Sequence, residues 1–220
     1  MTRELDRIVN TALELAEDQG WEKVRLYRVA ERMEMPLEGL LTHIREKEDL
    51  VDAWFDRADH AMLQAADSAM VAAMPTVERL EYLVLVWLRT LAPHRRVTAQ
   101  MIRGKLEAGH IHVQIPAVLR ISRTVQWLRE AGHRDAPGFY RGLEETVLTT
   151  IFVSTFVHWL RDQSPDQERT RRRLLLALRA AARLSRWVPG FRAHHHAVSG
   201  ALPAPAVVER PRASGVEARS

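Results

Sequence analysis

Apolar side chains recur at helical spacing through most of the chain. Over residues 2–19, five of them fall on one face of a helix with 3.6 residues per turn: Leu5, Ile8, Val9, Ala12 and Ala16. Gly20 follows, and glycine commonly ends a helix. The same spacing predicts two short helices over 25–33 and 37–44, joined by a tight turn at 34–36.

Longer helices are predicted in the rest of the chain, and no segment shows the strict alternation of a strand. Residues 94–114 look less regular, because Gly104 and Gly109 weaken a helix. The sequence Ser164-Pro165-Asp166-Gln167 has the pattern of a helix start, with Ser164 as the cap. The fold class is therefore all-α. One predicted long helix begins near residue 45, and four more cover 77–91, 116–131, 139–162 and 165–188.

Composition narrows the class of protein. The chain has 220 residues, 46% of them apolar, and no cysteine, which excludes disulfide frameworks, thiolate metal sites and cysteine nucleophiles. The apolar run without a charged residue at 146–160 is shorter than the roughly 18 residues of a membrane span. The N-terminus has no apolar run of the kind found in a signal peptide, so a cytoplasmic location is expected. Residues 190–220 have few large apolar side chains, which predicts a disordered tail.

The first sixty residues have the layout of a helix-turn-helix DNA reader. The positions that carry a family resemblance are Ile8, Ala12, Leu15, Gly20, Val29, Ala30, Met35, Leu40, His43, Ile44, Lys47, Glu48 and Leu50. At these positions the sequence resembles that of the TetR family of transcriptional repressors, over about residues 5–60. The resemblance implies a helix-turn-helix domain at 1–50 and a helical ligand-binding and dimerisation domain at 51–189. It also implies a homodimer that binds a double-stranded DNA operator and a small hydrophobic ligand, without a cofactor.

The resemblance places the DNA contacts on the second and third helices and at the start of the fourth. Arg25 and Lys47 are expected to be the principal phosphate anchors. Glu38 either repels phosphate or accepts a hydrogen bond from a cytosine. The predicted DNA-binding residues are Arg25, Arg28, Leu37, Glu38, Gly39, Leu41, Thr42, His43 and Lys47.

This helix-turn-helix departs from the family pattern at several positions. Arg25 stands where the family often has Thr, Pro36 where it often has Ser, and Leu41 where a Tyr commonly contacts phosphate. Residues 1–65 carry 9 Lys and Arg against 15 Asp and Glu, so the basic excess of the chain lies outside this segment. The alternative hypothesis is therefore a helix-turn-helix that no longer binds DNA.

Large side chains of the C-terminal half are candidates for a ligand pocket, with core packing or a dimer interface as the alternative for each. The candidates are Trp87, Met101, Trp127, Phe152, Phe156, His158 and Trp159. The run HWLRDQSPDQERTRRRL at 158–174 also resembles a stretch of the coenzyme Q biosynthesis family of lipid-binding proteins. That family has a TetR-like N-terminal half, so a non-enzymatic lipid-binding protein of ubiquinone biosynthesis is the alternative function.

No catalytic motif stands out. The chain contains no H-E-x-x-H, G-x-G-x-x-G, P-loop or G-x-S-x-G sequence, so neither an enzyme nor a metal site is expected. The segment 169–187 carries seven arginines beside an apolar face. A basic amphipathic helix can lie on an anionic membrane, which makes a peripheral membrane contact possible. The alternative is a helix at a dimer interface with solvated arginines.

Overall fold

The computed structural model describes residues 2–106, 111–133 and 138–185, and every regular element within these ranges is a helix. The predicted all-α class is confirmed. The predicted tail, 190–220, lies outside the described residues. The bounds are α1 Arg3–Gln19, η1 Trp21–Lys23, α2 Leu26–Arg32, α3 Leu37–Leu41, α4 Lys47–Ala66, α5 Ala69–Ala72, α6 Thr76–Leu91, η2 Ala92–His94, α7 Arg95–Leu106, α8 Ile111–Ala131, α9 Gly138–Trp159, η3 Pro165–Gln167 and α10 Glu168–Ser185, where η marks a 3₁₀ turn.

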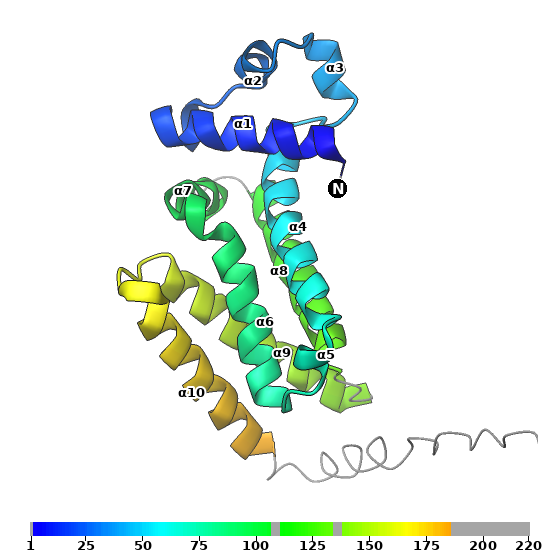
Figure 1. Ribbon diagram of the computed structural model, residues 1–220, viewed down its shortest axis with the longest axis vertical. Helices are drawn as coiled ribbons and strands as arrows, with labels where there is room; N and C mark the ends of the chain where they lie inside the picture. Colours follow the sequence, from blue (N-terminus) through cyan, green and yellow to red (C-terminus); the bar gives the residue numbers. More distant parts are fainter. Residues whose placement is uncertain (1, 107–110, 134–137, 186–220) are drawn as a thin grey trace, which may run out of the picture.

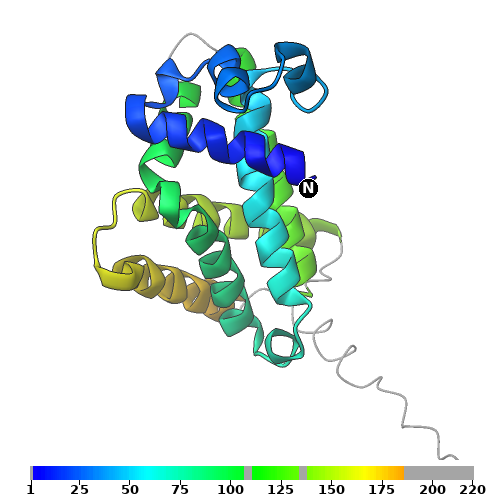
Figure 2. The same cartoon turned by 45° about the horizontal axis from the view of Figure 1, so that its top comes forward.

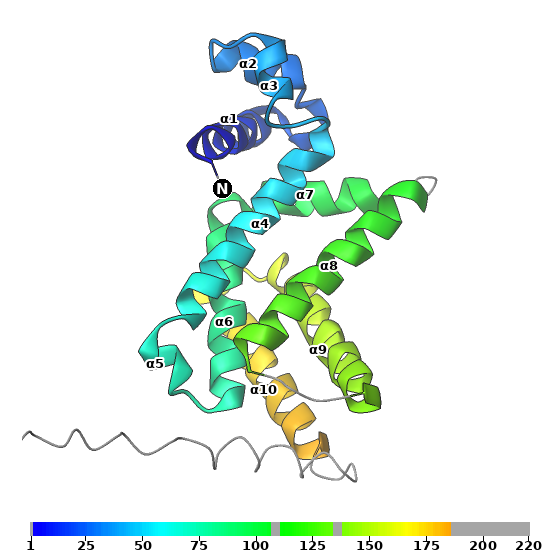
Figure 3. The ribbon, with the colours of Figure 1, turned by 90° about the vertical axis from the view of Figure 1, so that its right-hand side faces the viewer.

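The helices form a head and a body that share one long helix. The head consists of α1, η1, α2 and α3 at one end of the molecule, and the body consists of α5 to α10 (Figure 1). α4 starts at the head and runs into the body, where it packs against α6 and α8. α1 lies across the junction above α7 (Figure 2). α9 and α10 pack against each other in the body, away from α2 and α3 (Figure 3).

The head core is built from the apolar faces that the periodicity predicts. Thr2 caps α1 by accepting a hydrogen bond from the backbone N–H of Leu5 (3.3 Å), and α1 ends at Gly20, whose φ of 89° is a conformation that favours glycine. α2 then packs against α1, and α3 packs against α2. The side chains buried in this core include Ile8, Val9, Ala12, Leu13, Ala16, Val29, Ala30 and Leu40.

α3 is shorter than the sequence predicts, since it ends at Leu41 rather than near residue 44. The hydroxyl of Thr42 donates to the carbonyl oxygen of Gly39 (2.7 Å), and the chain then turns so that Ile44 is buried. The carboxylate of Asp49 accepts the backbone N–H groups of Arg45 (2.7 Å) and Glu46 (3.1 Å). This cap begins α4 and leaves no room for a further turn of α3.

The middle of the chain is more regular than the sequence predicts. The sequence predicts a less regular segment over 94–114, but Arg95–Leu106 forms α7, and α8 begins at Ile111 rather than at Pro116. Glycine costs a helix only about 1 kcal/mol, and the packing of α7 against α1, η1 and α8 outweighs that cost.

One buried carboxylate organises the connection between α9 and α10. Asp162 accepts hydrogen bonds from the N–H and hydroxyl of Thr170 (2.8 and 2.6 Å) and from the N–H and hydroxyl of Ser164 (2.9 and 2.7 Å). Burial alone would raise the pKa of Asp162, but these hydrogen bonds outweigh it and hold the pKa well below its usual range.

This arrangement corrects the predicted start of the last helix. α10 begins at Glu168 rather than at 165, and its first turn is capped by two side chains: Ser164 Oγ accepts the N–H of Arg169 (3.2 Å) and Asp162 accepts the N–H of Thr170 (2.8 Å). Asp162, Ser164 and Thr170 all lie in the stretch that resembles the coenzyme Q family. In this chain they make a helix junction, which any helical fold can use.

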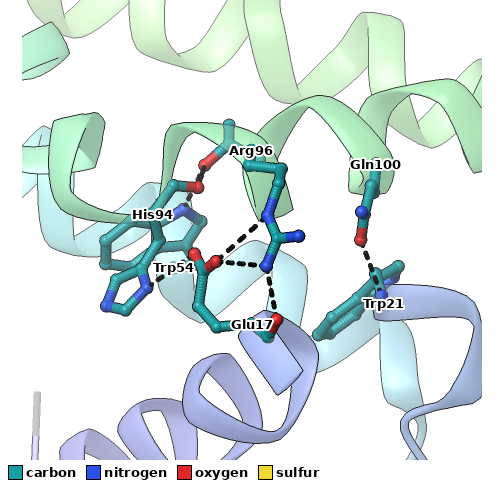
Figure 4. Close-up of polar contacts among 7 residues, drawn as sticks. Glu17, Trp21, Trp54, His94, Arg96 and Gln100 are labelled. Carbon is teal, nitrogen blue, oxygen red and sulfur yellow. Dashed lines mark hydrogen bonds and ion pairs between the residues drawn. The ribbon is translucent and has the colours of Figure 1, made fainter. Parts of the chain in front are cut away.

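Polar contacts tie the head to α7 across the junction (Figure 4). At the end of α1, the carboxylate of Glu17 pairs with Arg96 (2.8 Å) and with Nδ1 of His94 (3.2 Å). The backbone N–H of Trp21 in η1 donates to Oε1 of Gln100 (2.7 Å). Residues of η2 and α7 therefore hold both α1 and the turn that leads to α2.

The same helix is bonded to α4. Nε1 of Trp54 donates to the hydroxyl of Thr98 (3.0 Å), and both side chains are buried. The indole of Trp54 also meets the ring of His94 edge to face, with 5.7 Å between the centroids. α4 and α7 together form the connection through which the body holds the head.

The buried carboxylate at the α9–α10 junction gives a prediction for Asp162→Asn. An amide offers one acceptor oxygen in place of two, so the variant should lose about 2 kcal/mol in the free energy of unfolding at pH 7. Because the folded-state pKa lies below the unfolded one, the contribution of Asp162 is present above about pH 4 and is lost as the pH falls. Urea unfolding at several pH values should show a difference that shrinks below pH 4. Asp166→Asn, at an exposed neighbour, is the control, and an equal loss in both variants would contradict the assignment.

The head–body contact gives a second prediction. Gln100→Leu removes the acceptor of the Trp21 N–H, which should lower the free energy of unfolding by about 1 kcal/mol in urea titrations. Gln126→Leu makes the same chemical change at an exposed position of α8 and should have no measurable effect. Equal stability of the two variants would show that the bond does not hold the head.

Candidate functional site

The outer surface of α2 and α3 is the candidate nucleic-acid interface. Both helices bury one side in the head core and expose the other, and the turn between them passes through Glu34, which has a positive φ of 55°. α3 presents Leu37 and Leu41 to solvent, two large apolar side chains without a neighbour to cover them. Of the predicted DNA-binding residues, the exposed ones are Arg25, Arg28, Leu37, Glu38, Leu41, Thr42 and His43.

Two exposed arginines flank this surface at the start of α2. Arg25 precedes the helix and donates to the carbonyl oxygens of Glu22 (2.6 Å) and Val24 (3.1 Å). Arg28 donates to Oε1 of Gln19 (2.8 Å) and to the phenol oxygen of Tyr27 (3.3 Å), and this bond with Tyr27 raises the pKa of Arg28. Both guanidinium groups stay charged and exposed, as a phosphate contact requires.

Lys47 is placed differently from its predicted role. Its ammonium group lies 4.7 Å from the ring centroid of Trp21 and donates to the Trp21 carbonyl oxygen (2.6 Å). Partial burial lowers the pKa of Lys47. In this conformation the side chain joins the start of α4 to η1, so its role as a phosphate anchor stays a prediction.

The sequence-based interpretation missed two exposed residues beside this surface. Tyr27 has 49% of its surface exposed on α2, where its phenol can donate to a phosphate oxygen. The inward positions Val29 and Ala30 fix the face of α2, so the outward direction of Tyr27 was available from the periodicity. Arg45 lies exposed in the turn after α3 and adds a third arginine to this side of the head.

The body contains a small apolar cavity, partly open to solvent, between α4, α6, α7, α8 and α9. Its four aromatic rings meet at Trp87, with centroid separations of 5.0 Å for Trp87–Phe152, 5.5 Å for Trp87–Phe156 and 5.8 Å for Phe55–Trp87. The lining residues are Phe55, Trp87, Ile102, Arg120, Ile121, Thr124, Phe152 and Phe156.

A buried polar cluster borders this cavity. Asp59 of α4 accepts hydrogen bonds from Nε1 of Trp87 (2.7 Å), from Nη1 of Arg120 (2.7 Å) and from the hydroxyl of Thr124 (3.0 Å). Nη2 of Arg120 lies 3.0 Å from a carboxylate oxygen of Asp56, which is partly exposed. Neither Asp59 nor Arg120 was identified from the sequence, because only the packing of α4 against α8 brings the two side chains together.

The predicted ligand residues divide into two groups. Trp87, Phe152 and Phe156 line the cavity, whereas Met101 and Trp159 are buried in the core outside its lining. Trp127 lies on the surface of α8 with 46% exposed, and it does not line the cavity. His158 is also outside the lining, and its Nε2 is buried without a hydrogen-bond partner.

The outer face of α9 carries a stripe of exposed and partly exposed residues, spaced alternately four and three apart. The stripe consists of Leu143, Val147, Thr150, Ser154 and Val157. Next to it, α10 exposes Leu176 (60%) and Leu184 (68%) among arginines.

None of the helices in the described part of the chain is long and apolar enough to cross a membrane.

The structure is similar to that of a TetR transcriptional regulator from Nitrosomonas europaea. The sequences are 47% identical, the TM-score is 0.74, and the match covers 85% of this chain and 100% of that one. A TetR regulator from Rhodococcus sp. RHA1 matches with 19% identity and a TM-score of 0.58, over 79% of this chain and 94% of that chain. One from Streptomyces coelicolor matches with 16% identity and a TM-score of 0.59, over 92% of both chains.

These neighbours support a regulator rather than an enzyme. No family model matches the sequence, and no curated protein matches it. The two more distant structures share the fold alone, but the match with the Nitrosomonas europaea protein extends over that whole chain at 47% identity. With a helix-turn-helix exposed at one end of a helical body, this chain belongs to the TetR family of transcriptional regulators.

Proposed function

We propose that this TetR-family regulator binds its operator as a homodimer, through α2 and α3 of each head. A small apolar ligand that enters the cavity changes the affinity of the dimer for DNA. The observation that carries this proposal is that α4 and α7 each line the cavity and each bond the turn of the head that leads to α2. α4 supplies Phe55 to the cavity and begins at the head with Lys47, about 12 Å away along the helix axis. The domain division proposed with it, at residue 50, falls within the first turn of α4.

The second link runs through α7. Ile102 lines the cavity, while Gln100 and Arg96, less than two turns earlier on the same helix, bond the head. A ligand that changes the position of α7 relative to α4 would change the angle at which the head is held. Such a ligand shifts the DNA-binding equilibrium only by its differential affinity for the two arrangements.

The number of exposed arginines supports DNA binding by a dimer. Arg25, Arg28, Arg32 and Arg45 are exposed in each head, and tight sites use six to ten phosphate contacts. Two heads supply eight arginines. Thr42 and His43, exposed at the end of α3, add groups that can bond phosphates or base edges.

The proposed dimer interface is the stripe on α9 together with the exposed leucines of α10. A row of residues spaced four and three apart is the pattern of helices that pack along their length. Leu143, Val147 and Val157 would otherwise leave an apolar surface in water. In the described part of the chain, no observation favours the lipid-binding alternative or a membrane contact of α10.

DNA binding is tested by Arg25→Ala and Arg28→Ala. Each variant removes a contact that does not depend on sequence, so binding should weaken at every selected fragment, and the salt dependence should fall by about one unit per monomer. Purified protein is used to select genomic fragments, and affinities are then measured at two salt concentrations. Arg89→Ala, an exposed arginine of α6 in the body, is the control and should bind as the unmodified protein does. Unchanged affinity in both head variants would contradict the proposed reading surface.

Dimerisation is tested by Val147→Glu. A carboxylate at the middle of the stripe on α9 should convert a dimer at micromolar concentration to a monomer, as measured by sedimentation, because burying it unpaired is costly. Met70→Glu places the same charge on an exposed apolar residue of α5 and should leave the dimer intact. A monomeric unmodified protein would contradict the proposed interface.

A further inference from the structure

Arg120 is the charged residue of the cavity wall, and its hydrogen bonds are incomplete. Its side chain is 7% exposed, so water outside the protein does not solvate it. Nη1 is used by Asp59 and Thr124. Nε has no hydrogen-bond partner, and Nη2 lies beside Asp56 as an ion pair without making a hydrogen bond of good geometry. Buried donors of this kind require an acceptor, and the cavity is the free space that Arg120 lines.

The charge of the cluster limits which acceptor fits. Two carboxylates, Asp59 and Asp56, already face the single positive charge of Arg120, at 2.7 and 3.0 Å. The three groups together carry a net negative charge when all are ionised. An anionic ligand at Arg120 would be repelled by both carboxylates, and a cationic ligand would be repelled by the guanidinium group. An uncharged oxygen acceptor satisfies the donors without either cost.

The remaining wall sets the shape of the ligand. Trp87 and Phe55 lie nearly parallel, at 13° between their planes, and Phe152 and Phe156 meet Trp87 edge to face. Ile102 and Ile121 complete the apolar lining. Such surfaces favour a flat ring, which can stack on one aromatic side chain and meet the edge of another.

From these contacts we propose that the cavity binds an uncharged aromatic compound with a carbonyl-type oxygen that accepts hydrogen bonds from Arg120. The inference rests on the proposed ligand control and gives it a ligand class. Thr124 and Trp87 are not the donors, since the Thr124 hydroxyl and Nε1 of Trp87 already bond Asp59. The specificity for the oxygen therefore belongs to Arg120.

Four small probes of nearly equal size test this class on the full chain without DNA. Acetophenone carries the carbonyl, α-methylstyrene replaces its C=O by C=CH₂, benzoate carries a negative charge, and phenyltrimethylammonium carries a positive one. Dissociation constants come from ligand-detected NMR titrations at pH 7. Acetophenone should bind about tenfold more tightly than α-methylstyrene, because a hydrogen bond to a charged donor is worth at least that factor. Benzoate and phenyltrimethylammonium should bind more weakly than acetophenone.

A charge-neutral pair of substitutions assigns the preference to Arg120. Arg120→Met alone leaves Asp59 buried without its cation, which can unfold the protein, so it is combined with Asp59→Asn. The amide oxygen of the new side chain can still accept from Trp87 and Thr124. This double variant should bind acetophenone and α-methylstyrene equally. Arg123→Met, at an exposed arginine one turn further along α8, should keep the tenfold preference.

Several results would overturn the inference. They are equal binding of acetophenone and α-methylstyrene to the unmodified protein, tighter binding of either charged probe, no binding of any of the four, or a preference that persists in the double variant. If the double variant is unfolded in its circular dichroism spectrum, the four-probe comparison on the unmodified protein decides alone. Because no DNA is present in these titrations, such results leave operator binding and dimerisation standing.

Discussion

Asp59 is a carboxylate in the middle of the body, and three helices take their relative positions from it. It lies on α4 and accepts hydrogen bonds from Trp87 on α6 and from Arg120 and Thr124 on α8. Removing one partner from a buried ion pair typically costs 3–5 kcal/mol, so these helices cannot change places without losing much of the stability of a small protein. The position of α4 matters further, because this helix also carries the head.

The head is held by contacts of two kinds. Apolar residues of α1 and α4 pack directly, while Glu17 and the Trp21 N–H bond residues of η2 and α7. Lys47, at the start of α4, donates a hydrogen bond to the Trp21 carbonyl oxygen. Trp21 is therefore held at both its N–H and its C=O group. The turn that leads into α2 is thus fixed to the body and to α4 by two polar bonds on one residue.

Local periodicity was sufficient for α1, α2 and α6, since each of these helices buries a single face whose residues follow one another at helical spacing. It failed where distant parts of the chain decide the structure. α7 contains Gly104 and looked less regular, but its packing against α1, η1 and α8 outweighs the cost of one glycine. α3 ends early because Asp49 caps the next helix, which no count of apolar positions reveals.

The same limit applies to the sites. The exposed cations of α2 followed from the family resemblance, and Trp87, Phe152 and Phe156 from their size and spacing. Arg120 could not be found in this way, because an arginine on a helix is normally solvated, and only the fold brings it to Asp59, 61 residues away in sequence. Trp127 was chosen because a large aromatic residue is more often buried than not, and the fold leaves 46% of its surface exposed on α8.

The shared use of α4 has a consequence for engineering chimaeric regulators. In this chain the DNA-reading part is not an interchangeable module, because Trp21 and Glu17 find their partners, Gln100 and Arg96, on a helix that begins more than forty residues after the head ends. A hybrid that joins these first fifty residues to the body of another regulator keeps the recognition residues but loses the bonds that orient them. A working crossover would have to transfer α7 together with the head, or rebuild its two polar partners in the recipient.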